Sequence, residues 1–214
     1  MKSPTIGFGT DPGQWTAMPH CLYQKSNPHL EKHIYHKQKE RQTMAERNGL
    51  VTLKGNPVTL TGNEVKVGDK APDAELTANN LAPVKISGYK GKVCIISAVP
   101  SLDTPICDME TRRFNTEADK LGKDVAILTI SMDLPFAQTR WCGAAGVDKV
   151  VTLSDHRNGE FGEKYGVLIK GLRLLARSLF VIDKQGVIQY IQIVPEVGQE
   201  PNYDAVLSAA RKLI

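Results

Sequence analysis

The chain has 214 residues, of which 41% are hydrophobic and 23% are charged, so it suits one globular domain with a substantial core. Its formal net charge of +4 is small, and the body of the sequence has no basic stripe, so no nucleic-acid partner is expected. Because no run approaches about 18 consecutive apolar residues and prolines and glycines break up the N-terminus, we expect no membrane span, no secretory signal and a cytoplasmic location.

The first 46 residues differ from the rest and are predicted to form an extension ahead of the main domain, residues 47–214. Residues 1–43 contain scattered apolar side chains without a sustained period, so we expect disorder, or one short helix across Glu31–Glu46. Cys21 lies among four histidines, but their spacing matches no zinc motif, which favours a solvated tail over a metal site. These histidines are His20, His29, His33 and His36.

From Val51 onwards, segments typical of strands and helices alternate, beginning with a hairpin around Gly55-Asn56. The expected strands are Val51–Lys54, Val58–Thr61, Glu75–Leu76, Val84–Ile86, Val93–Ala98, Val125–Ser131, Val150–Leu153, Leu179–Asp183 and Val187–Ile193. The expected helices are Cys107–Leu121, Phe136–Ala145, Glu160–Tyr165 and Tyr203–Leu213. Strand–helix–strand units followed by a hairpin and a last helix fit an α/β, thioredoxin-like fold, with a central mixed sheet flanked by helices and an N-terminal β-hairpin.

Cys107 is the strongest candidate for a reactive group. It lies between the apolar strand Val93–Ala98 and a helical segment, so its sulfur is expected near the first turn of a helix. Free backbone N–H groups and the positive end of the helix dipole favour a thiolate there. Thr104, three residues upstream, can turn its hydroxyl toward the sulfur. The alternatives are a buried structural thiol for Cys107 and a simple helix N-cap for Thr104.

The pattern Pro100-x-x-x-Thr104-x-x-Cys107 resembles the active-site motif of the peroxiredoxins. The longer run PSLDTPIC resembles their thiol peroxidase subfamily, of the atypical two-cysteine type, although Pro105 stands where a small residue is expected. DLPFAQTRWCGA, from Asp133, is similar to the segment that carries this subfamily's resolving cysteine, and GNPVTL is similar to its N-terminal hairpin. The segment MAERNGL, from Met44, resembles the usual start of such a chain, so a misassigned start codon is an alternative explanation of the extension.

This resemblance implies a peroxiredoxin fold and a thiol-dependent peroxidase that reduces hydrogen peroxide and organic hydroperoxides to water and alcohols. Cys107 would be oxidised to a sulfenic acid, and Cys142 would resolve it as an intramolecular disulfide. Thr104, Arg177 and Pro100 would surround the reactive sulfur, with Arg173 as the competing arginine. Thioredoxin is the implied reductant, a homodimer is the implied assembly, and no cofactor or metal is expected.

Three alternatives concern the cysteines. A redox sensor or relay would use the same pair, whereas a dithiol oxidoreductase would need a Cys-x-x-Cys motif, which the sequence lacks. Cys142 could instead be a core cysteine of a helix, and Cys94, in the middle of a strand, is best interpreted as core. Because Cys107 and Cys142 are predicted on different helices, and a disulfide needs Cα atoms within about 7 Å, we expect both segments to unravel locally on oxidation.

Overall fold

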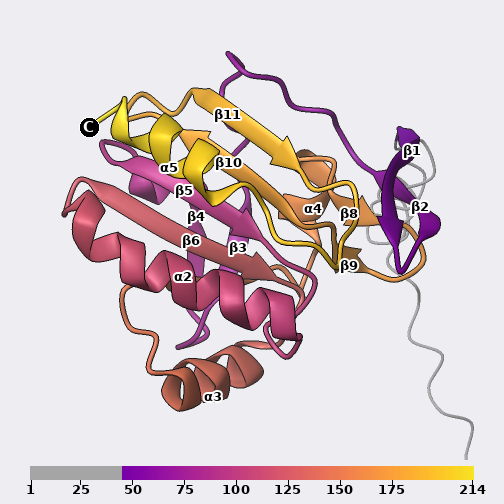
Figure 1. Ribbon diagram of the computed structural model, residues 1–214, viewed down its shortest axis with the longest axis horizontal. Helices are drawn as coiled ribbons and strands as arrows, with labels where there is room; N and C mark the ends of the chain where they lie inside the picture. Colours follow the sequence, from indigo (N-terminus) through magenta and orange to yellow (C-terminus); the bar gives the residue numbers. More distant parts are fainter. Residues whose placement is uncertain (1–44) are drawn as a thin grey trace, which may run out of the picture. The chain divides into compact units, whose positions relative to one another are not determined.

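The computed structural model describes residues 45–214 (Figure 1). The predictions made for residues 1–44, namely disorder or a helix, the alternative start and the solvated Cys21, lie outside this part of the chain. At its described end, Glu46 begins a strand, so the proposed helix does not extend to that residue. Residues Met44–Ile214 group into one compact unit.

A seven-stranded mixed sheet forms the centre of this unit, in the order β11-β10-β5-β6-β7-β3-β4. The neighbours β5, β6 and β7 run parallel, while β10 pairs antiparallel with both β5 and β11, and β3 with both β7 and β4. The strands are β3 (Glu75–Ala78), β4 (Pro83–Lys85), β5 (Val93–Ala98), β6 (Val125–Ser131), β7 (Val151–Ser154), β10 (Ser178–Ile182) and β11 (Ile188–Ile193).

Helices cover both faces of this sheet. They are the 3-10 helix η1 (Ile86–Tyr89), α2 (Pro105–Leu121), α3 (Pro135–Ala145), α4 (Glu160–Lys164) and α5 (Tyr203–Arg211). Along β5, Val93 and Ile95 pack in the cluster with α2 and α5, while Cys94 and Ile96 pack in the cluster with α4. Burial on both faces explains why β5 is apolar almost throughout. None of the helices in residues 45–214 is long and apolar enough to cross a membrane.

A second, antiparallel sheet has the order β1-β2-β8-β9. Its strands are β1 (Glu46–Leu53), β2 (Asn56–Thr61), β8 (Leu168–Ile169) and β9 (Leu174–Leu175). The predicted N-terminal hairpin is present, but its turn is Lys54-Gly55, one residue earlier than expected. Both turn residues have positive φ, 52° and 77°, as a two-residue type I′ turn requires. The strands β8 and β9 were not predicted, because two residues are too few to show a period.

Candidate active site

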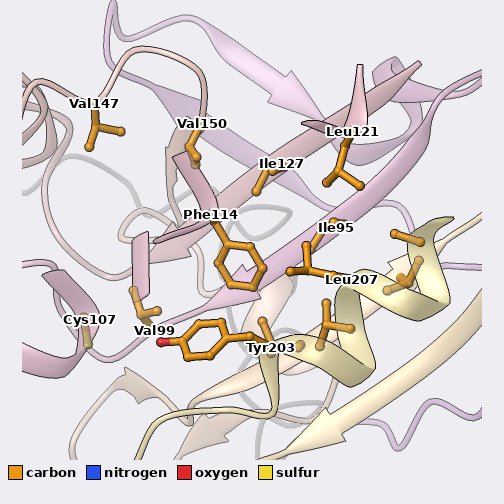
Figure 2. Close-up of a cluster of buried hydrophobic side chains, with 14 of the residues drawn as sticks. Ile95, Val99, Cys107, Phe114, Leu121, Ile127, Val147, Val150, Tyr203 and Leu207 are labelled. Carbon is orange, nitrogen blue, oxygen red and sulfur yellow. The ribbon is translucent and has the colours of Figure 1, made fainter. Parts of the chain in front are cut away.

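The first turn of α2 places Cys107 at the end of the central strand β5. The helix begins at Pro105, two residues earlier than predicted, with Thr104 at the N-cap position. Pro105 suits the first helical position because its missing N–H would have no partner within the helix. Cys107 is therefore in the first turn, fully buried, at one end of the apolar cluster around Phe114 and Tyr203 (Figure 2).

Two side chains donate hydrogen bonds to the sulfur of Cys107. The hydroxyl of Thr104 lies 2.8 Å from Sγ, and Nη2 of Arg177 lies 3.2 Å from it. The same hydroxyl is 3.0 Å from the carbonyl oxygen of Ser101, so its one proton has two acceptors. A thiolate competes better for that proton than a neutral carbonyl does, because hydrogen bonds to ionised acceptors are stronger. Thr104 thus occupies the N-cap position but directs its hydroxyl to the sulfur.

Arg177 is held in place on three sides and is only 1% exposed. Its Nη1 forms an ion pair with Glu110, and its Nε donates to the carbonyl oxygen of Val197 at 3.0 Å. Burial opposes the positive charge, but Glu110 and Cys107 together outweigh burial and raise the pKa of the guanidinium. The side chain therefore stays charged and offers its remaining edge to the sulfur.

The hairpin of the second sheet supports this arrangement. The N–H of Val197 donates to the carbonyl oxygen of Thr52 in β1, and the N–H of Thr52 donates to that of Pro195. The Thr52 hydroxyl also donates to the Glu196 carboxylate at 2.7 Å. The strand β1 thus fixes the segment that contains Val197, whose carbonyl oxygen accepts the hydrogen bond from Arg177 Nε.

Glu110 and Ser97 are parts of the site that were not predicted from the sequence. Glu110 is fully buried and accepts a hydrogen bond from the Ser97 hydroxyl at 2.6 Å, while its other oxygen pairs with Arg177. The sequence does place Glu110 three residues after Cys107, so both side chains are on the same face of the helix. Because Cys107 is buried on that face, the Glu110 carboxylate is directed toward the sheet as well.

The remaining predicted residues lie as follows. Arg173, the competing arginine, is exposed in the turn between β8 and β9 and donates to the carbonyl oxygen of His156. Pro100 is buried just after β5. Cys94 is buried, as expected for a core residue, and burial raises its pKa to about 11.

Cys142 is on α3 and is half-buried. Its sulfur lies 3.4 Å from the hydroxyl of Thr152 on β7, away from the donors that surround Cys107. Cys94, Cys107 and Cys142 are all free thiols in residues 45–214. The geometry therefore brings Thr104, Arg177 and Cys107 together, and leaves the Cys142 sulfur facing the sheet.

A buried thiol between two hydrogen-bond donors, at the start of a helix on a mixed thioredoxin-like sheet, defines a thiol-based oxidoreductase of the peroxiredoxin class. Comparisons with known proteins agree. The Redoxin family model matches residues 66–207. A thiol peroxidase from Bacillus subtilis is 58% identical over 164 residues, which are 77% of this chain and 98% of that protein.

Solved structures lead to the same class. A peroxiredoxin-like protein from Aquifex aeolicus is 47% identical with a TM-score of 0.73, over 80% of this chain and 99% of that one. The thiol peroxidase from Chromobacterium violaceum, 18% identical over 76% of this chain and 95% of that one, has the same fold with a TM-score of 0.68. The chain belongs to the thiol peroxidases of the peroxiredoxin family and is a thiol-dependent peroxidase. The predicted fold class is confirmed.

Proposed function

We propose that Cys107 reduces hydrogen peroxide and organic hydroperoxides to water and alcohols. The observation that carries this proposal is the position of the Cys107 sulfur between Thr104 Oγ1 and Arg177 Nη2. The thiolate attacks one peroxide oxygen, the O–O bond breaks, and Cys107 becomes a sulfenic acid. The leaving oxygen takes a proton and departs as alcohol or water, so the peroxide gains the two electrons that the sulfur loses.

Thr104 and Arg177 would direct both the sulfur and the peroxide. Donors placed where negative charge develops typically lower a barrier by about 3 kcal/mol, provided that the site excludes water. Burial of Cys107, Pro100 and Arg177 supports such exclusion. Glu110 would keep the guanidinium in position through their ion pair.

The second step would use Cys142. Its thiol attacks the sulfur of the Cys107 sulfenic acid, a disulfide forms, and water leaves. An external dithiol then returns both cysteines to thiols, and we propose thioredoxin for this role because its potential of about −270 mV suits the reduction of such a bridge. The family resemblance also supports a homodimer, which sedimentation velocity of the reduced protein would test.

A coupled assay with thioredoxin, its reductase and NADPH tests this cycle. We expect many turnovers per protein molecule with hydrogen peroxide and with cumene hydroperoxide. The alternative reading as a redox sensor or relay requires one oxidation per molecule and then no further consumption of peroxide. A single stoichiometric burst in the complete reducing system would contradict the peroxidase cycle.

Replacing Arg177 should slow the first step. In Arg177→Lys, we expect the second-order rate constant for oxidation of Cys107 by hydrogen peroxide to fall about hundredfold, because a lysine keeps the charge but loses the planar fork of donors. Stopped-flow mixing of reduced protein with peroxide measures this constant directly. Arg177→Gln would leave buried Glu110 unpaired, at a cost of about 3–5 kcal/mol in folding free energy, so the lysine variant is the cleaner test.

Arg173→Lys is the matched control for this prediction. The two arginines are four residues apart, but Arg173 is exposed, and its hydrogen bond within the described residues goes to the carbonyl oxygen of His156, outside the site. We expect Arg173→Lys to oxidise at the wild-type rate within about twofold. Equal losses in both variants would show that Arg177 has no special part in the reaction.

A chain that begins at Met44 should keep its peroxidase rate. Within residues 45–214, the side chains that contact Cys107 and the hairpin that supports Arg177 lie between Glu46 and Val197. We expect kcat/KM of the truncated protein to stay within about twofold of the full chain, and its thermal unfolding to remain cooperative. A large rise in KM on truncation would show that residues 1–43 contribute to the site.

A further inference from the structure

A hydrogen bond joins Asp108, the residue after Cys107, to Trp141, the residue before Cys142. Asp108 is in the first turn of α2, and Trp141 is in α3. The indole Nε1 of Trp141 donates to Oδ1 of Asp108 at 3.0 Å. The two segments that carry the cysteines are therefore joined one residue away from each sulfur.

Arg112 completes this link, one helical turn further along α2. Its Nε donates to both carboxylate oxygens of Asp108, at 3.0 Å and 2.9 Å, and its Nη1 donates to the carbonyl oxygen of Ala145 at 2.7 Å. Its guanidinium carbon also lies 5.8 Å from the ring centre of Trp141. Asp108, Arg112 and Trp141, which we call the interhelix latch, thus hold α3 against α2 both beside Cys142 and at the last residue of α3.

Burial identifies the strongest part of the interhelix latch. Trp141 is only 8% exposed, so its N–H depends on a protein acceptor, and an ionised carboxylate is a strong one. The side chains of Asp108 and Arg112 are 34% and 47% exposed, and water screens their ion pair. Loss of the Asp108 carboxylate would leave the indole N–H buried without its acceptor.

Formation of the disulfide conflicts with the interhelix latch. The Cys142 sulfur faces Thr152, whereas the Cys107 sulfur faces Arg177 and Thr104. To meet Cys107, the Cys142 sulfur must leave its contact with Thr152 on β7. A shift of this part of α3 would carry the neighbouring Trp141 away from Asp108 and break their hydrogen bond.

We propose that Asp108 is a positioning residue that slows the conversion of the Cys107 sulfenic acid into the disulfide, because its hydrogen bond to Trp141 keeps α3 packed against α2. This inference rests on the proposed function of Cys142 as the resolving cysteine. It also has a consequence for excess peroxide. While the contacts of the interhelix latch are intact, a second peroxide can oxidise the sulfenic acid to sulfinic acid and leave as one alcohol or water. A dithiol does not reduce the sulfinic acid back to a thiol.

The test separates the two steps in Asp108→Ala, Asp108→Asn and wild-type protein. Reduced protein is mixed with hydrogen peroxide, quenched with acid and an alkylating agent at millisecond times, and analysed by mass spectrometry for sulfenic acid, disulfide and sulfinic acid. In Asp108→Ala we expect the first-order rate constant of disulfide formation to rise about tenfold, as for the loss of one hydrogen bond to a charged group. The second-order constant for the first oxidation should stay within about threefold of wild type.

Asp108→Asn separates the hydrogen bond from the charge. Its side-chain oxygen can still accept from Trp141, while the ion pair with Arg112 is lost, so we expect a rise of only about twofold to threefold. The matched control is Asp119→Ala, also on α2, whose side chain is 65% exposed and pairs with Lys149. It should leave both constants unchanged. At high peroxide, the sulfinic acid fraction should fall about tenfold in Asp108→Ala relative to wild type.

Two results would overturn the proposal. One is an unchanged or slower disulfide step in Asp108→Ala when circular dichroism shows a folded protein. The other is an equal rise in Asp119→Ala, which would indicate general loosening of α2. If wild-type protein forms no Cys107–Cys142 disulfide at all, the resolving function of Cys142 itself is wrong, and this outcome is visible before any variant is compared.

Discussion

Cys107→Ser should consume no peroxide above background in the coupled assay, a loss of at least about a thousandfold in turnover. A serine hydroxyl remains protonated at neutral pH even between Thr104 and Arg177, and its oxygen cannot be oxidised to an equivalent of a sulfenic acid. Removal of one sulfur changes the volume of the site little, so the variant should fold. Loss of peroxide reduction with a normal circular dichroism spectrum is the expected result.

Cys94→Ser is the matched control for this substitution. Cys94 is the second residue of β5, the strand that leads toward α2, and it packs on the opposite face of the sheet, in the cluster with α4. Burial raises its pKa to about 11, so it remains a thiol at neutral pH. We expect Cys94→Ser to keep most of the peroxidase rate. A near-normal rate in Cys107→Ser would contradict the assignment of the reactive cysteine.

Two central strands, β5 and β6, could be predicted from the sequence with their correct ends, whereas β7 and β10 are each shifted by one residue from the predicted bounds. β5 and β6 are buried in the middle of a sheet, so they appear as continuous apolar runs between polar residues. The strands β8 and β9 could not be predicted, because their two-residue lengths show no period and their pairing depends on contacts with the hairpin. The hairpin turn was misplaced by one residue, since Lys54 adopts a positive φ that its side chain does not suggest.

In the site, contacts between residues close in sequence could be predicted, whereas contacts between distant parts of the sequence could not. Thr104 and Cys107 are three residues apart at a helix start, so their proximity follows from local geometry. The approach of Arg177 depends on the antiparallel register of β10 with β5, in which Ser178 lies opposite Ala98. Only the family resemblance predicted that arginine. Glu110 was missed because an acid in an amphipathic helix usually faces water, whereas here it is buried beside Arg177.

Cys142→Ser should separate oxidation from recycling. We expect reduced Cys142→Ser to react with hydrogen peroxide at the wild-type rate, because Cys142 Sγ contacts Thr152 and not the donors around Cys107. Turnover with thioredoxin should fall at least about hundredfold, since the Cys107 sulfenic acid loses the thiol proposed to displace its oxygen as water, and Cys94 packs on the opposite face of the sheet. A stopped-flow burst of one equivalent, followed by arrest in the coupled assay, is the measurement.

The wild-type protein supplies the complementary result. One equivalent of peroxide should produce a species that runs as a monomer on a denaturing, non-reducing gel. Peptide mapping of this species should find a disulfide between Cys107 and Cys142. Because both sulfurs must leave their present partners, hydrogen exchange should rise around residues 104–112 and 138–146 while β5 and β6 stay protected. A covalent dimer on that gel would place the resolving thiol on a second copy of the chain, and Cys142→Ser would then have to be tested in mixed dimers with Cys107→Ser.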